Sequence, residues 1–154
     1  MRVLVIHNFH RKGSSSGDDQ VFKSETALLE KNGHEVVRYT VCNDSFDEAG
    51  MLHKVFKTLG MLWSFENYKK VKGIIRSKRP DIVHVHGSST LIAVELFTAM
   101  LAGVPVRISH SHNTICSHPL LHETLKPFLK VVSNCYLACG ELAGKWMYGD
   151  GAFK

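Results

Sequence analysis

The chain has 154 residues, 44% of them hydrophobic, which is enough for one domain with an apolar core but not comfortably for two. Lys and Arg exceed Asp and Glu by 19 to 14, so the formal charge of +5 favours anionic partners such as nucleotides, phosphates or acidic lipids. No stretch reaches the roughly 18 uninterrupted apolar residues of a membrane-spanning helix. Because no secretory leader precedes the first strand pattern, we expect reduced cysteines and a cytoplasmic protein.

The predicted elements alternate between strands and helices along the whole chain. Strands are expected at residues 2–6, 34–40, 81–85, 105–109 and 134–138. Helices are expected at 18–31, on either side of Gly60, and at 91–101, 119–132 and 141–148. This order predicts an α/β fold: a single Rossmann-like, three-layer α/β/α domain over residues 1–154, with a mainly parallel sheet of about five or more strands.

The first predicted helix follows a loop rich in glycine and serine. Free backbone N–H groups at a helix start favour a phosphate or carboxylate, so this loop is a candidate anion site, and its candidate residues are Gly13, Ser14, Ser15 and Gly17. Asp18 and Asp19 would compete with an anion there, which leaves a flexible loop with capping acids as the alternative. The apolar residues predict a core stripe along this helix, made of Val21, Ala27, Leu28 and Leu29.

Two buried-strand patterns each end in a pair of histidines, His84 with His86 and His110 with His112. Residues two apart on a strand share a face, and the carboxyl ends of parallel strands are where open sheets bind ligands. We expect His84 and His110 to be hydrogen-bonded core residues, and His86 and His112 to face the cleft. The pairs also resemble metal ligands, but Asp81 is the one nearby acid and stands at the wrong end of its strand, so we expect no metal.

The segment 51–79 is basic and rich in aromatic residues, with Glu66 as its one acid. Such helices can lie on an anionic membrane surface. The alternative is a helix pair that packs on the sheet and exposes its basic face to water. Nucleic acid is not an expected partner, because no DNA-binding helix pattern accompanies the charge.

The chain resembles the N-terminal, acceptor-side domain of family 4 retaining glycosyltransferases, which have the GT-B architecture. The stretch 17–36 carries Gly17-Asp18-Asp19-Gln20-Val21-Phe22 and Gly33-His34-Glu35-Val36, similar to one subgroup of that family. The second half looks more like a subgroup linked to capsular and exopolysaccharide assembly. Its motifs are His86-Gly87-Ser88-Ser89, Ala102-Gly103-Val104-Pro105, His110-Ser111-His112-Asn113-Thr114 and Ala138-Cys139-Gly140.

The resemblance implies a sugar transfer from a nucleotide-sugar donor to a saccharide or lipid-linked acceptor, without a metal or other cofactor. It places the loop from Gly13 to Gly17 against the diphosphate and acceptor, and His112 against the transferred sugar as the catalytic residue. It lines the acceptor side with His86 and Gly87, and we add His110 and Asn113 to the substrate-binding residues.

The family's second domain, which binds the donor, is absent from these residues, so we expect the chain to be inactive alone. A separate chain carrying that C-terminal domain could complete the enzyme. Two other functions remain open. One is a non-catalytic membrane-docking or assembly subunit that uses residues 51–79, and the other is a metal-dependent hydrolase built on the histidine pairs.

Overall fold

A computed structural model describes residues 1–9, 16–42, 65–116 and 119–153. All pairings in its five-stranded sheet are parallel, and the strand order is β2-β1-β3-β4-β5. The strands are β1 (Arg2–Phe9), β2 (Glu35–Cys42), β3 (Ile82–Gly87), β4 (Val106–Ser111) and β5 (Cys135–Ala138). The helices are α1 (Gly17–Lys31), α3 (Phe65–Lys78), α4 (Ala93–Leu101), α5 (Pro119–Val132) and α6 (Glu141–Tyr148), with 3₁₀ turns η1 (Thr90–Ile92) and η2 (Asp150–Phe153).

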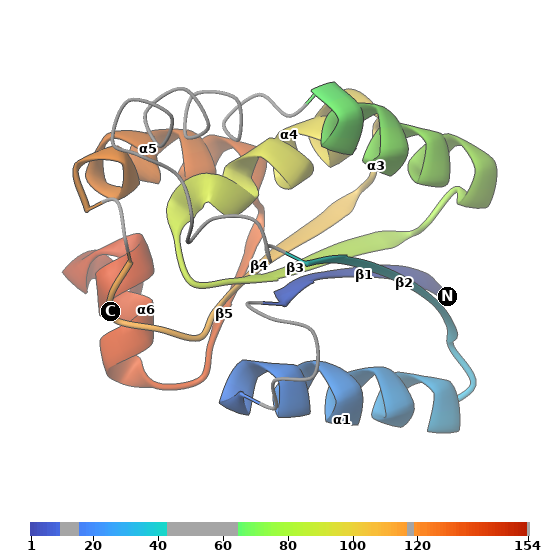
Figure 1. Cartoon of the computed structure of the whole chain (residues 1–154), viewed down its shortest axis with the longest axis horizontal. Helices are drawn as coiled ribbons and strands as arrows, with labels where there is room; N and C mark the ends of the chain where they lie inside the picture. Colours follow the sequence, from blue (N-terminus) through green and yellow to red (C-terminus); the bar gives the residue numbers. More distant parts are fainter. Residues whose placement is uncertain (10–15, 43–64, 117–118, 154) are drawn as a thin grey trace.

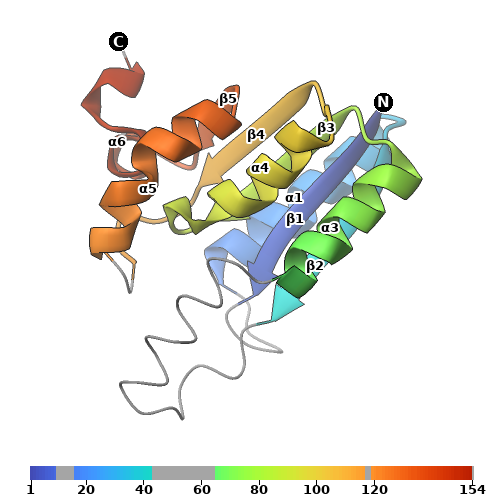
Figure 2. The ribbon, with the colours of Figure 1, turned by 90° about the horizontal axis from the view of Figure 1, so that it is seen from above.

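The elements form three layers. Helix α1 lies under one face of the sheet, and α3, α4 and α5 lie over the other (Figure 1). Seen from above, α3 and α4 run side by side across β1, β3 and β4, and α5 follows towards β5 (Figure 2). The predicted Rossmann-like α/β fold with a parallel sheet is therefore confirmed. Strand β1 is longer than expected, because it continues through His7 to Phe9.

Alternation along the strands separates an apolar face from a partly polar one. On β3, Val83 and Val85 join the larger core beneath α3 and α4, as Leu4 and Ile6 do on β1. The intervening residues face α1. There the apolar cluster is small, with Val3, Val5 and Phe22 buried, and polar residues occupy the rest of this face towards the carboxyl ends of the strands.

Helix α1 corrects one expectation about its core stripe. Val21, Ala27 and Leu28 of the predicted stripe are exposed, and only Leu29 packs against the buried cluster as expected. The buried face consists of Asp19, Phe22 and Thr26. The helix turns polar residues towards the sheet because the sheet presents histidines to it, and a purely apolar face would leave those imidazoles without partners.

Helix α3 carries the described part of the basic segment. Its Val71 and Ile75 are buried in the core, whereas Lys69, Lys70 and Arg76 are exposed. For α3, packing on the sheet with a solvated basic face is confirmed, and residues 51–64 lie outside the described residues. Among the helices that the structure describes, none has the length and apolar character needed to cross a bilayer.

Candidate functional site

The strand connections diverge between β1 and β3. Strand β1 leads to α1 on one face, and β3 leads through η1 to α4 on the other (Figure 1). Open α/β sheets bind ligands at such a point, outside the carboxyl ends of the strands. The pairing register places His7 beside His86, and His86 beside His110. Three imidazoles thus form a row across β1, β3 and β4, on the side of the sheet that faces α1.

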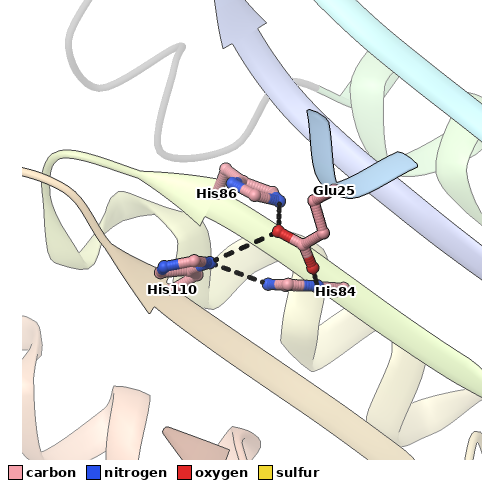
Figure 3. A group of neighbouring side chains, drawn as sticks. All are labelled: Glu25, His84, His86 and His110. Atoms are coloured by element: carbon pink, nitrogen blue, oxygen red, sulfur yellow. Dashed lines mark hydrogen bonds and ion pairs between the residues drawn. The ribbon is translucent and has the colours of Figure 1, made fainter. Parts of the chain in front are cut away.

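Glu25 of α1 reaches this row from below and was not identified from the sequence as a site residue. Its Oε1 lies 2.7 Å from His84 Nδ1, and its Oε2 lies 3.3 Å from His86 Nε2. Its Oε2 also lies 3.8 Å from His110 Nδ1. Figure 3 shows the carboxylate pointing into the angle between the three rings. One carboxylate therefore contacts imidazoles from two strands.

The two predicted histidine pairs are joined to each other across β3 and β4. His84 Nε2 lies 3.1 Å from His110 Nδ1, with the ring planes 14° apart. His86 Nδ1 lies 2.9 Å from His112 Nε2, with the planes 10° apart. His84 and His110 are thus joined by a hydrogen bond between nearly parallel rings, and so are His86 and His112. The rings of His84 and His86 then stack at 4.4 Å between centroids, which places one pair against the other.

A second carboxylate group lies beside the histidines at the start of α1. Asp19 Oδ1 is 2.7 Å from His7 Nε2, and both side chains are almost fully buried. Its Oδ2 accepts a hydrogen bond from the Ser16 backbone N–H at 3.0 Å. Burial alone would raise the pKa of Asp19, but the hydrogen bonds from His7 and Ser16 outweigh it and lower the pKa. Asp19 thus occupies the start of α1, as its acidic sequence predicted.

The structure changes the predicted exposure of one site residue. His84 and His110 are buried and hydrogen-bonded, as expected. His86 is 0% exposed and does not face a cleft, which corrects the expectation for it. The cause is that Glu25 covers its Nε2, while the rings of His84 and Phe22 lie against it.

The remaining predicted residues lie at the carboxyl ends of β3 and β4 or beyond the described residues. His112 is half-buried, and its backbone N–H donates to the Gly87 carbonyl at 3.3 Å. The Asn113 amide donates to Ser88 Oγ at 3.0 Å, tying together the two loops that leave the strands. Gly17 is the exposed first residue of α1. Gly13, Ser14 and Ser15 lie outside the described residues.

Burial lowers the pKa of three of these imidazoles, those of His86, His110 and His112. It lowers the pKa of His110 to about 4, helped by His112 and His84. Neutral imidazoles offer one N–H and one lone pair each, so the site presents hydrogen bonds rather than positive charge.

The ligand types required for a metal site are also present. Glu25, His84, His86 and His110 have one donor atom each within 4.8 Å of one another. Zinc is bound in proteins by such imidazoles and carboxylates. The expected lack of a nearby acid was wrong, because α1 supplies Glu25. Asp81 instead accepts a hydrogen bond from the Arg2 backbone N–H at 2.7 Å, at the opposite edge of the sheet.

Comparison with solved structures defines the class of the fold. The chain is similar to UDP-GlcNAc 2-epimerase from Methanocaldococcus jannaschii, with a TM-score of 0.60, 13% identity, and coverage of 98% of this chain and 43% of that one. It is equally similar to the UDP-GlcNAc-bound 2-epimerase from Neisseria meningitidis, with a TM-score of 0.58, 13% identity, and coverage of 98% and 43%. For MnaA of S. aureus in complex with UDP, the TM-score is 0.61 at 13% identity, with coverage of 99% and 41%. The chain thus spans about two fifths of each of these proteins and shares the Rossmann-like fold of that part.

The family follows from the sequence comparison. The model of Glycosyltransferase Family 4 matches residues 21–141, a span that includes Glu25 and all four histidines of the two pairs. The chain belongs to this family, and the resemblance seen in its motifs is confirmed. No curated protein matches the chain.

Proposed function

We propose that this chain is the acceptor-side half of a retaining glycosyltransferase. It acts with a nucleotide-sugar donor and a saccharide or lipid-linked acceptor in the synthesis of surface polysaccharide, in the cytoplasm. The chain binds acceptor by itself but transfers no sugar alone. Transfer requires the donor-binding half, which a separate chain can supply.

One observation carries the proposal: the family match covers residues 21–141, and within it the histidines of β3 and β4 gather at the carboxyl ends of the strands. That edge is where sheets of this class bind ligands. The structural neighbours include a UDP-GlcNAc complex and a UDP complex. These support a nucleotide sugar as donor.

The proposed roles follow the positions of the side chains. His112 is half-buried at the end of β4 and is held by His86, so its ring has a fixed orientation. A fixed imidazole can position a sugar hydroxyl and stabilise charge that develops near the reacting carbon. We assign His112 the contact with the transferred sugar. We also propose that Gly87, His110 and Asn113 line the acceptor side, and that the segment 13–17 binds the diphosphate, a role that rests on the family resemblance because residues 13–15 lie outside the described part of the chain.

The test separates binding from transfer. Saccharides and lipid-linked oligosaccharides are titrated into the purified chain and followed by ligand-observed NMR. Each is then incubated with a panel of UDP- and GDP-sugars while product is sought by mass spectrometry. We expect binding without transfer, and loss of binding in His110→Ala. His34→Ala is the matched control, because His34 is a half-buried histidine at the opposite edge of the sheet, just before β2.

Two results would contradict the proposal. Sugar transfer by the chain alone would show that the donor site is already present. Saccharide binding that is unchanged in His110→Ala would show that the acceptor does not bind at this edge of the sheet. Addition of a chain with the donor-binding half should restore transfer with the original His112 and not with alanine there.

A second candidate function rests on a basic groove at the other edge of the sheet. Between the ends of α3 and α4, a groove of about 640 Å³ is lined by Lys72, Arg76 and Arg79, with no acidic side chain among its lining residues. Such a surface fits anionic lipid headgroups. It supports membrane docking through residues 51–79, as an assembly subunit or together with sugar transfer.

Liposome flotation tests this second function. Reversing Lys69, Lys70 and Lys72 to glutamate should abolish binding to vesicles that contain anionic lipid, and neutral vesicles should bind neither form. A control with Lys23, Lys31 and Lys130 reversed makes the same change of net charge on other exposed helix surfaces. Equal binding by the two triple variants would rule out this face as the docking surface.

A further inference from the structure

Glu25 stands at the head of two parallel chains of polar contacts. In the first, its Oε1 lies 2.7 Å from His84 Nδ1, and His84 Nε2 is hydrogen-bonded to His110 Nδ1 at 3.1 Å. In the second, its Oε2 lies 3.3 Å from His86 Nε2, a contact at ion-pair distance without hydrogen-bond geometry, and His86 Nδ1 is hydrogen-bonded to His112 Nε2 at 2.9 Å. Both chains cross from α1 through β3 to β4 and end at the carboxyl edge of the sheet.

The direction of these hydrogen bonds follows from which groups carry charge. A carboxylate oxygen presents lone pairs, which repel the lone pair of a ring nitrogen, so the close contacts of Glu25 favour N–H on His84 Nδ1 and on His86 Nε2. A neutral imidazole has one N–H, so the other nitrogens of these rings carry lone pairs. His110 and His112 must therefore donate to them, from Nδ1 and Nε2 respectively. Their remaining nitrogens, His110 Nε2 and His112 Nδ1, are left as acceptors.

Burial favours this neutral arrangement over one with a charged ring. The side chain of His86 is 0% exposed, and an imidazolium there would lose its hydration. The lowered pKa values of His86, His110 and His112 agree with neutral rings. Asp18 and Glu25 are the acids whose charge acts on His112, and His7 and His84 oppose them.

The same contacts argue against a metal at this place. A metal ion needs one lone pair from each ring, and the lone pairs must converge on it. Both nitrogens of His84 already face protein atoms, namely Glu25 Oε1 and His110 Nδ1. In the two hydrogen-bonded pairs, His84 Nε2 faces His110 Nδ1 and His86 Nδ1 faces His112 Nε2, so these four nitrogens are already occupied by one another.

We propose that Glu25, through His84 and His86, fixes the tautomers of His110 and His112 so that both present a hydrogen-bond acceptor at the carboxyl edge of the sheet. Two neutral acceptors suit a neutral ligand that donates from hydroxyl groups, and they do not attract a phosphate. The site at β3 and β4 therefore binds the hydroxyl-rich part of a saccharide, while the diphosphate of a donor must bind elsewhere. Glu25, His84 and His86 are positioning residues in this scheme. The inference that the ligand is a saccharide rests on the proposed function, whereas the tautomers inferred for His110 and His112 do not.

The test observes the ring nitrogens directly. Long-range ¹H–¹⁵N NMR of the chain with labelled histidine, at pH 7 and after metal analysis, reports which nitrogen of each ring is protonated. We expect Nδ1–H on His84 and His110, and Nε2–H on His86 and His112. A charged His84 would donate from both nitrogens and would give His110 the opposite tautomer, which would overturn the proposal. One equivalent of zinc retained by the purified chain would also overturn it.

A variant of the carboxylate tests the causal step. In Glu25→Gln one oxygen remains an acceptor while the amide nitrogen can only donate, so one of the two chains must reverse its tautomers and the other must keep them. Glu30→Gln is the control, because Glu30 is on the same helix but pairs with Arg38 at the surface. Unchanged tautomers in Glu25→Gln would contradict the assigned role of Glu25.

Parallel titrations with methyl glucoside and inorganic phosphate test the ligand class. Methyl glucoside should shift the resonance of His112 Nδ1, and phosphate should leave it in place. A shift of the His112 Nδ1 resonance with phosphate, or no shift with methyl glucoside, would contradict the inference that a saccharide binds here. If the tautomers are as stated but the chain alone transfers sugar, the proposed function fails while the assignment of the tautomers stands.

Discussion

Glu95 is a buried carboxyl group whose environment predicts a measurable dependence of stability on pH. It lies on α4, is 7% exposed, and accepts a hydrogen bond at Oε1 from the Asn67 amide at 2.9 Å. Tyr39 Oη donates to Asn67 Oδ1 at 2.6 Å, which fixes the orientation of that amide. Burial raises the pKa of Glu95 to about 7, against a partial offset from its hydrogen bonds. Glu95 is therefore largely protonated in the folded chain at mildly acidic pH.

The sign of the effect follows from linkage. A carboxyl whose folded pKa exceeds its unfolded value stabilises the fold fully below the unfolded pKa, and this stabilisation is lost as pH rises through the folded pKa. For a rise from 4.5 to about 7, the loss amounts to about 3 kcal/mol over that range. The buried histidines have lowered pKa values and act in the opposite direction, since they destabilise the fold as pH falls.

The variant Glu95→Gln isolates the contribution of this group. Glutamine keeps the acceptor oxygen for Asn67 and cannot ionise. The free energy of unfolding of the variant therefore lacks the decrease that ionisation of Glu95 causes at high pH. We expect the variant and the parent to be similar near pH 4.5, and the variant to be more stable by about 3 kcal/mol at pH 8. Urea unfolding at both pH values measures the difference. Glu123→Gln is the control, since Glu123 is exposed and pairs only with Lys126 among described residues. Parallel stability profiles of variant and parent would refute the reasoning.

Two further predictions concern packing around the candidate site, and urea unfolding checks both. Phe22→Ala should cost about 3–5 kcal/mol, whereas Leu28→Ala on the same helix should stay within about 0.5 kcal/mol because Leu28 is 60% exposed; equal losses would contradict the assigned face of α1. Gly87→Ala should cost about 1–3 kcal/mol, because its Cβ would collide with buried Ile92, and a neutral result would show that η1 can move aside.

The strands of the sheet were predictable because their signals are local. Strands β3 and β4 are short apolar runs that follow prolines and end in polar residues, and both begin within one residue of the predicted positions. The shared face of His84 and His86 also follows from the two-residue period of a strand. Strand β1 extended further than expected, because His7 and Asn8 interrupt its apolar run while the backbone pairing continues.

The partner of the histidines could not be predicted in the same way. Glu25 lies in a helix 59 positions before His84, and no periodicity within α1 tells which face meets the sheet. The apolar stripe pointed to Leu28 and Val21, but the histidines across from α1 require polar neighbours. The one sequence signal was that Glu25 stands three residues after Phe22, a spacing that places the two side chains on one face of a helix.

The last described strand of the sheet has consequences for association. β5 pairs with β4 on one side, and no described strand pairs with its other side. Tyr136 and Leu137, at its centre, are 42% and 41% exposed. A short strand with open backbone groups and uncovered apolar side chains is a template on which another extended segment can add. We therefore expect association between chains to begin at β5, away from the histidines, and charged substitutions at Tyr136 and Leu137 to raise solubility while leaving the imidazole network intact.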